Sequence, residues 1–445
     1  MVIAYNYTEK LIPHKFVSKL FLFSNVIDRI ARSSKKTIGF VFLLGYISFS
    51  HAQSDTTGRA ADVKDSLQQC EKENAQRDIG DFYRAVIHKK KSEEICVPGK
   101  KAGKLHVAVL PAAGYSLITR LAVVVAANGA FYTDNEGKTK LSAINTSIAY
   151  TQNEQIILPI LSNIWTPGNK LNLVGDWRYY KYPEYTYGLG GHSSATQNAD
   201  LLHYYNIIIR EAVLKEVSHS TYLGFAYNLD YHWGVSEFGP VDGSESDFKK
   251  YGFASKSVSS GISAVALFDS RKNTINPSDA NYASINFCPN FTFLGSDHDY
   301  RSLIVDMRKY ITPGNSDNVL AFWSYNWFTF NGNAPYLDLP STGWDAYANM
   351  GRGYIQSRFR GKNLMYLETE YRFNITRHGF LGGVVFANAQ SVTDWPSNKF
   401  TTIAPAAGLG LRIKVNKHSN TNVCIDYGFG LNGSKGIFIN LGEVF

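Results

Sequence analysis

Hydrolytic chemistry needs a nucleophile, a base and an orienting group within reach of one another, and one short stretch of the sequence offers these residue types. His192, Ser193 and Ser194 are consecutive, and Asn198 could orient a histidine ring. A histidine and a serine two positions apart share a face only on a strand, whereas this stretch follows the sequence GLG at 188–190, which is typical of a loop. A hydrolase is therefore the least favoured of three functional hypotheses, and we expect a protein that is not an enzyme.

The cysteines do not suggest a metal site. Cys70, Cys96, Cys288 and Cys424 match no spacing that is typical of zinc ligands. Cys70 and Cys96 either pair in an oxidising compartment or remain separate thiols, and the sequence leaves both possibilities open. The chain also has no phosphate-binding loop or nucleotide fingerprint. We expect no metal and no cofactor.

The first 52 residues have the order of a secretory leader. Basic residues between positions 29 and 36 precede the apolar run 38–49, and small residues follow before Gln53. The run is 12 residues long, whereas a spanning helix needs about 20. We predict an extended leader with a signal peptide over 1–52, with an uncleaved anchor as the alternative.

Removal of this leader changes the charge of the chain. Residues 1–52 contain seven of the 45 Lys and Arg residues and two of the 37 Asp and Glu residues, so the mature net charge is +3 rather than +8. The basic character therefore belongs mostly to the leader. We expect no nucleic-acid partner.

The last ten residues alternate in polarity with a period of two, which indicates a strand between lipid and a wet lumen. One face carries Ile437, Ile439 and Leu441, and the other carries Phe438, Asn440 and Gly442. Aromatic residues make up 14% of the chain, yet the mature chain has no apolar run near 18 residues. The sequence thus predicts a transmembrane β-barrel whose last strand runs from Gly436 to the C-terminal residue Phe445.

Turn signals upstream of this strand complete the predicted sheet. The other strands are expected at 105–110, 119–132, 140–151, 155–165, 170–180, 201–214, 220–231, 250–268, 281–294, 300–309, 319–330, 362–373, 380–389, 404–415 and 421–430. The fold class is then all-β, a 16-stranded antiparallel transmembrane β-barrel of the bacterial outer membrane over 105–445. A soluble β-sandwich is the alternative, but it explains neither the leader nor the aromatic content.

The connections agree with this count. An outer-membrane barrel has short periplasmic turns and long outer loops, so the long connections should all follow odd-numbered strands. The connections 181–200, 232–249, 331–361 and 390–403 do so, and 269–280 is the exception. Residues 53–104 are polar, with loosely helical spacing of apolar residues. We predict a short periplasmic segment there that is either helical or flexible.

With these elements in place, the chain resembles the bacterial surface-antigen family of barrels that includes BamA and TamA. The resemblance covers 105–445. It is carried by 182–190 (YPEYTYGLG), 269–271 (DSR), 352–354 (RGY), 370–372 (EYR) and 426–430 (DYGFG). The family implies clients that are unfolded outer-membrane proteins, and barrel-assembly machinery as a further partner.

The resemblance also implies a set of interacting residues inside the lumen. Arg352, Gly353 and Tyr354 fall in the sixth connection on the long-loop side, after the eleventh strand, where the family has an inward-folded loop with such a tip. A guanidinium inside a barrel requires a planar acceptor, and Glu370 on the twelfth strand is the expected partner. Asn388 lies where the family often has an aspartate, and it could accept a hydrogen bond without a charge. The alternative is that Arg352 is a solvated loop arginine.

Three functions follow as hypotheses. The first is insertion or translocation of polypeptides through a seam between the first and last strands. The expected weak points of this seam are Pro111, which ends the first strand early, and Gly436, Gly442 and Phe445 in the last strand. The second is a passive or plugged pore, and the third is the hydrolase. The family's assembly members carry POTRA domains of roughly 75 residues before the barrel, and the 52 residues of 53–104 are too few for one. The resemblance therefore supports the barrel more than the assembly role.

Overall fold

The structure of the chain is a computed structural model. It describes residues 75–81, 106–116, 119–134, 139–314, 316–417 and 420–445. The predicted leader, Cys70 and Cys96 lie outside the described residues, as does most of the predicted segment 53–104.

The described residues form one antiparallel sheet whose strands agree closely with the predicted ones. The long strands are β1 (His106–Ser116), β2 (Arg120–Phe131), β3 (Ser142–Thr151), β4 (Ile156–Trp165), β5 (Leu171–Lys181), β7 (Asp200–Ser218), β8 (Thr221–Glu237), β9 (Lys256–Asp269), β10 (Ala280–Asn290), β11 (Tyr300–Ile311), β12 (Val319–Phe330), β13 (Asn363–Asn374), β14 (Leu381–Asp394), β16 (Ala404–Asn416), β17 (Thr421–Phe429) and β18 (Lys435–Leu441). The two short strands are β6 (Glu184–Thr186) and β15 (Lys399–Phe400). The predicted all-β fold with sixteen long strands is thus confirmed within the described residues.

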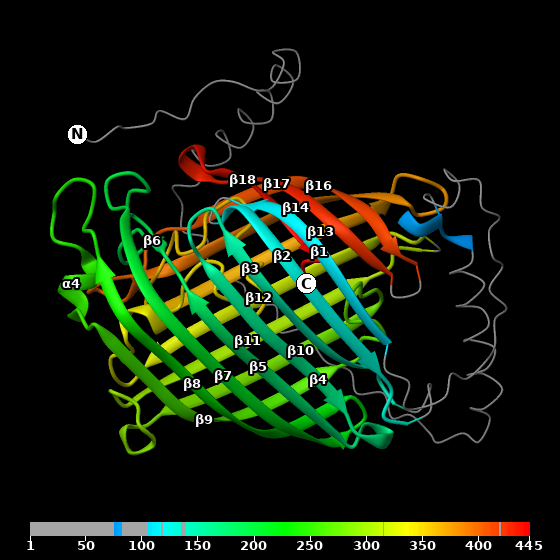
Figure 1. Cartoon of the computed structure of the whole chain (residues 1–445), viewed down its shortest axis with the longest axis horizontal. Helices are drawn as coiled ribbons and strands as arrows, with labels where there is room; N and C mark the ends of the chain where they lie inside the picture. Colours follow the sequence, from blue (N-terminus) through cyan, green and yellow to red (C-terminus); the bar gives the residue numbers. More distant parts are fainter. Residues whose placement is uncertain (1–74, 82–105, 117–118, 135–138, 315, 418–419) are drawn as a thin grey trace, which may run out of the picture. The chain divides into compact units, whose positions relative to one another are not determined.

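Each long strand pairs with the next, and the sheet curls around a lumen (Figure 1). β1 and β18 come to lie side by side. Among the described residues, however, the backbone ladder of β1 is with β2 and that of β18 is with β17. The barrel is therefore open along one seam, where two strand edges face each other without a ladder.

Side chains alternate between the two faces of the sheet. On β18, Ile437, Ile439 and Leu441 are 41%, 44% and 62% exposed and point outward, as the alternation predicts. The inward face of β12 and β13 is packed, with Trp323 on β12 and Tyr366 on β13 fully buried. Within the described residues, no helix is long and apolar enough to cross a membrane.

The long connections gather at one end of the sheet and the compact turns at the other, which we call the long-loop end and the short-turn end. The loop between β12 and β13 and the helix α4 (Asp247–Gly252) belong to the long-loop end (Figure 1). α4 replaces the first residues of the strand predicted at 250–268. It begins there because the Ser246 hydroxyl accepts a hydrogen bond from Lys249 N at 3.0 Å.

Pro111 does not end the first strand, so that prediction was wrong. β1 continues to Ser116, and Pro111 lies opposite Val125 in its register with β2. A proline lacks a backbone N–H and is tolerated in an edge strand, where that nitrogen can face away from the neighbouring strand. β1 is such an edge.

The last strand does not reach Phe445, which is a second correction. β18 ends at Leu441, and Gly442 has a φ of +90°, a left-handed conformation that glycine adopts readily. The following residues turn into the lumen, where the Phe445 side chain is 3% exposed. The chain turns there because Glu443 has ion-pair partners inside the barrel, as described below.

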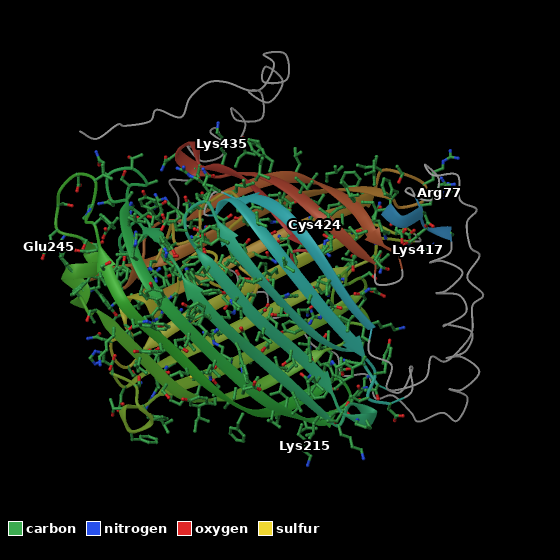
Figure 2. The ribbon with its side chains drawn as sticks, in the orientation of Figure 1. Arg77, Lys215, Glu245, Lys417, Cys424 and Lys435 are labelled. Atoms are coloured by element: carbon green, nitrogen blue, oxygen red, sulfur yellow. The ribbon has the colours of Figure 1, made fainter. Side chains whose placement is uncertain are left out.

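Residues 75–81 lie against the short-turn end. Lys417 Nζ is 3.1 Å from a carboxylate oxygen of Asp81, and Arg77 N donates to His378 O at 3.0 Å. Figure 2 labels Arg77 and Lys417 at this end. Part of the segment before the barrel therefore contacts the turns that precede β14 and follow β16.

Candidate functional site

The loop between β12 and β13, residues 331–362, folds inward and fills part of the lumen. Its tip begins at Asp345, whose carboxylate accepts hydrogen bonds from the backbone N–H groups of Asn349 and Met350 at 2.9 and 2.8 Å. These bonds fix a tight turn that directs the following residues toward the wall formed by β13, β14, β16 and β17. Asp345 is itself buried, and burial raises the pKa of its carboxyl above the ordinary value.

The Arg352 side chain is 1% exposed and lies inside the lumen. Its Nη2 forms ion pairs with Glu368 and Glu370 on β13, and its Nη1 pairs with Asp426 on β17. We call these four residues the lumen lock. The structure thus brings Arg352 and Glu370 together and adds two carboxylates that the sequence analysis did not single out.

Gly353 and Tyr354 hold the tip against the wall. Gly353 has a φ of +106°, and a Cβ there would lie 2.7 Å from the Ala406 Cβ, so both backbone conformation and space favour glycine. The Tyr354 hydroxyl donates to Pro405 O at 2.7 Å and accepts from Leu431 N at 2.9 Å. The tip is therefore bonded to β16 and to the connection between β17 and β18.

Asn388 belongs to the site, but its role differs from the expected one. Its Nδ2 donates to the Arg352 backbone oxygen at 2.9 Å, so it holds the backbone and not the guanidinium. On the same strand, the centroid of the Phe386 ring lies 3.8 Å from the guanidinium carbon of Arg352. β14 therefore supports Arg352 with a neutral amide and a cation–π contact where a carboxylate was expected.

The lumen lock continues into a second layer of ion pairs. Arg372 Nη2 lies 2.7 Å from Glu370 Oε2, and Arg412 pairs with Asp426. Both arginines also approach Glu443, with Arg412 Nε at 2.8 Å and Arg372 Nε at 3.7 Å from its Oε2. In the described part of the chain, three guanidinium groups thus face four buried carboxylates, and these ion pairs offset much of the cost of burying the charges.

A signal for part of this network was present in the sequence. Glu368, Glu370 and Arg372 are two positions apart on β13, so their side chains share the lumenal face. Asp426 opens the DYGFG sequence that contributed to the family resemblance. The ion pair of Arg412 with Glu443 had no such signal in the sequence, because it depends on the inward turn of the chain at Gly442.

Opposite the lock, the loop contacts the other side of the lumen. Arg178 on β5 donates from Nη2 to Ala346 O at 2.6 Å. Closer to the long-loop end, Arg360 Nη2 lies 3.4 Å from Glu184 Oε1, which joins the loop to β6. Burial raises the pKa of Glu184 to about 7, and the Arg360 charge and a Ser357 hydrogen bond oppose this shift. The loop is therefore held by both walls.

The residues of the hydrolase hypothesis do not form a catalytic arrangement. His192 Nε2 is bonded to the hydroxyl oxygens of Thr401 and Thr402, at 3.0 and 2.9 Å. The Ser193 hydroxyl accepts from Arg358 Nη1 at 3.0 Å. The Asn198 side chain accepts from Ser194 N, so it stabilises the loop backbone. These contacts hold the loop in place.

The predicted seam residues have separate positions. Gly436 lies on the inward side of β18, opposite Gly428 in the register with β17. Gly442 forms the turn after the strand, and Phe445 lies in the lumen away from the outer surface. Pro111 is on β1, across the seam. Over the part of the chain that the structure describes, no three His, Cys, Asp or Glu side chains are grouped as metal ligands.

Comparisons with known proteins bear on the fold. No family model matches the chain. No curated protein matches it either.

Solved structures do match. CdiB from Escherichia coli aligns with a TM-score of 0.50 at 9% identity, over 79% of this chain and 63% of CdiB. BamA from Haemophilus ducreyi lacking POTRA domains 1–3 aligns with a TM-score of 0.49 at 14% identity, over 77% of this chain and 70% of that BamA. CdiB from Acinetobacter baumannii aligns with a TM-score of 0.48 at 12% identity, over 76% of this chain and 60% of that CdiB. At these identities the likeness to E. coli CdiB concerns the fold, a single barrel-shaped antiparallel sheet. This chain spans less than two thirds of either CdiB.

Proposed function

We propose that the chain is an outer-membrane barrel that assists insertion or translocation of polypeptides, and that the seam between β1 and β18 is the route. The observation that carries the proposal is the pair of strand edges that lie side by side without a ladder. Unpaired N–H and C=O groups at a strand edge can bind an incoming strand. Unfolded outer-membrane proteins are the proposed clients, and outer-membrane lipid is proposed to surround the barrel.

The filled lumen supports a route at the seam over one through the pore. The loop 331–362 is bonded to Arg178 on one wall and, through Arg352, to β13 and β17 on the other. A polypeptide that passed along the axis would have to separate these buried ion pairs first. An opening at the seam leaves the contacts of β13 and of the Arg178 wall in place.

The test is reconstitution into liposomes with an unfolded barrel protein as client. We expect the client to reach its folded, protease-resistant form faster with the protein than in empty liposomes. Arg352→Ala should slow this step, because the lumen lock fixes the wall next to β18. Equal rates with and without the protein would contradict the proposal.

A plugged pore is the second candidate, and the loop that crosses the lumen favours it. Deletion of residues 345–360 removes both Arg352 and the Ala346 contact. If the chain is a pore, the deletion should raise single-channel conductance while neither form accelerates client folding. An insertion activity in the undeleted chain would exclude this as the sole function.

A further inference from the structure

Residues 442–445 leave the sheet and enter the lumen as a short segment outside the strand. The Val444 and Phe445 side chains are 2% and 3% exposed. Glu443 N donates to Ile275 O at 2.9 Å, and Val444 O accepts from Asn349 Nδ2 at 2.7 Å. The segment has thus exchanged sheet pairing for main-chain hydrogen bonds to two separate connections.

The Phe445 ring lies in an aromatic and cationic surrounding. Its centroid is 5.2 Å from that of Trp323 and 6.3 Å from that of Tyr310. The guanidinium of Arg372 lies 5.3 Å from the ring centroid, and its Nη2 donates to Phe445 O at 2.9 Å. Aromatic and cation–π contacts of this kind favour an aromatic side chain at this position.

Glu443 lies two residues before Phe445, and its carboxylate has binding groups of its own. Oε2 lies 2.8 Å from Arg412 Nε, and Oε1 accepts from Asn422 Nδ2 at 2.8 Å. Arg372 lies between the two side chains, with its Nε 3.7 Å from Glu443 Oε2 and its guanidinium over the Phe445 ring, so the carboxylate and the ring enter adjacent subsites. Main-chain bonds combined with pockets for alternate side chains are the usual means of binding an extended peptide.

The binding groups are positioned by partners other than the segment. Arg372 is held by Glu370, Arg412 is held by Asp426, and Trp323 Nε1 donates to Asp306 at 2.9 Å. The buried Arg372 Nη1 has no hydrogen-bond partner among the described residues. The site would therefore persist without the segment, and it has a donor to spare for a further acceptor.

We propose that this lumenal socket, formed by Tyr310, Trp323, Asn349, Arg372 and Arg412, is a peptide-binding site. Its ligand class is an extended segment with a carboxylate at one position and an aromatic ring two positions later. Residues 443–445 occupy the socket as an intramolecular ligand. Tyr310 is the penultimate residue of β11 and the Ile275 connection covers the segment, so the socket opens toward the short-turn end.

The connection 270–279 then has a role in the site. It is the long connection at the short-turn end that broke the predicted alternation of loop lengths. Ile275 bonds to Glu443 and Asn276 Nδ2 donates to Asn420 O at 3.3 Å, so it reaches from β9 and β10 to the turn before β17. Its length is what allows this contact. Displacement of the segment requires this connection to release Glu443.

Peptide binding to the full chain in detergent micelles tests the proposal without any insertion assay. The probe is a labelled, amidated hexapeptide NLGEVF, which copies residues 440–445, and its fluorescence anisotropy is measured. Phe445→Ala should bind it at least about tenfold more tightly than the wild type, because the intramolecular segment competes at a millimolar effective concentration. The peptides NLGEVA and NLGQVF should bind Phe445→Ala more weakly than NLGEVF does.

Two further measurements keep the proposal falsifiable if Phe445→Ala does not fold. Glu443→Gln weakens the intramolecular segment with a smaller change and should also bind NLGEVF more tightly than the wild type. A photoreactive phenylalanine analogue in the peptide should cross-link to β11 or β12 in the unaltered protein. Equal binding of NLGEVF and NLGEVA, or cross-links confined to the outer face, would overturn the proposal and leave the proposed function untouched.

Discussion

At the scale of single residues, Arg352 matters most because three carboxylates depend on it. Glu368, Glu370 and Asp426 are buried beside its guanidinium, and among the described residues only Glu370 and Asp426 have an ion pair with another arginine. A buried carboxylate without a partner is costly. Removal of Arg352 therefore affects the wall of the barrel as well as the loop.

Arg352→Ala should lower the free energy of unfolding by about 3–5 kcal/mol, the usual cost of breaking a buried ion pair. Arg352→Lys should recover part of this, because one ammonium cannot meet three carboxylates in the fork geometry of a guanidinium. Urea unfolding followed by tryptophan fluorescence measures the change. Arg377→Ala, at an exposed arginine of a short turn, is the matched control, and an equal loss in both would contradict the importance of the lock.

We expect Glu184 to make the long-loop end sensitive to pH. Burial raises its pKa to about 7 in the folded protein, compared with about 4.3 in an unfolded chain. The folded state then binds more protons than the unfolded state between these values, so the stability from this group is present at low pH and is lost as the pH rises through about 7.

We therefore expect the loop around β6 to open more readily at pH 8 than at pH 5. Hydrogen exchange of residues 184–191, corrected for the intrinsic pH dependence of exchange, measures the opening. Glu184→Gln should flatten the profile, because the amide keeps its size and has no titration. A wild-type profile as flat as that of the variant would show that Glu184 does not control this loop.

At the scale of elements, the strands were the most predictable part of the molecule. The strand predicted at 319–330 is β12 to the residue, because alternating burial and flanking turn residues are both local signals. The end of β18 was not predictable in this way. The formal alternation continues through Glu443 and Phe445, and only the inward ion pairs of Glu443 decide that the chain turns away from the outer surface.

The candidate site was predictable only in outline. Resemblance identified Arg352, Gly353 and Tyr354, and the need for a carboxylate identified Glu370. Which other side chains meet them depends on the register of β13 with β14 and of β16 with β17, and no local pattern specifies that register across four strands. Asn388 shows the same limit, because its amide meets the backbone of Arg352 and not its guanidinium.

Gly442→Ala should loosen the segment after β18. The φ of +90° strains any side chain there, and the new Cβ would lie 3.2 Å from Ile275 Cγ2, so we expect a loss of roughly 1–2 kcal/mol. Cys424 reports the change, because its buried thiol donates to Gly442 O at 3.1 Å. Its alkylation should accelerate in the variant, as measured by mass spectrometry.

Gly295→Ala is the matched control for this variant. Gly295 also has a left-handed φ, of +95°, but a Cβ there would have no neighbour within 4 Å, and the residue is in the connection between β10 and β11. It should carry the backbone strain without accelerating Cys424 alkylation. Equal acceleration in the two variants would mean that general loosening, and not release of the segment, exposes the thiol.

At the scale of the whole molecule, the barrel combines a filled lumen with an open seam. The loop 331–362 and residues 442–445 meet at the bond between Asn349 and Val444, so the lumen contents are tied to the last strand. β18 is the shortest of the long strands and ends where this tie begins. We infer that movement of β18 at the seam acts on the loop tip at Asn349, while the ion pairs of Arg352 with β13 stay in place.

The most direct test of the proposed function is to close the seam covalently. Cysteines at Val109 on β1 and Ile437 on β18, both outward and exposed, with neighbouring positions as alternatives and the native cysteines changed to serine, allow oxidation across the seam. In liposomes, the oxidised protein should lose its acceleration of client folding and regain it on reduction, while a protein with the Val109 cysteine alone should be unaffected by oxidant. Full activity of the cross-linked protein would contradict a route between β1 and β18.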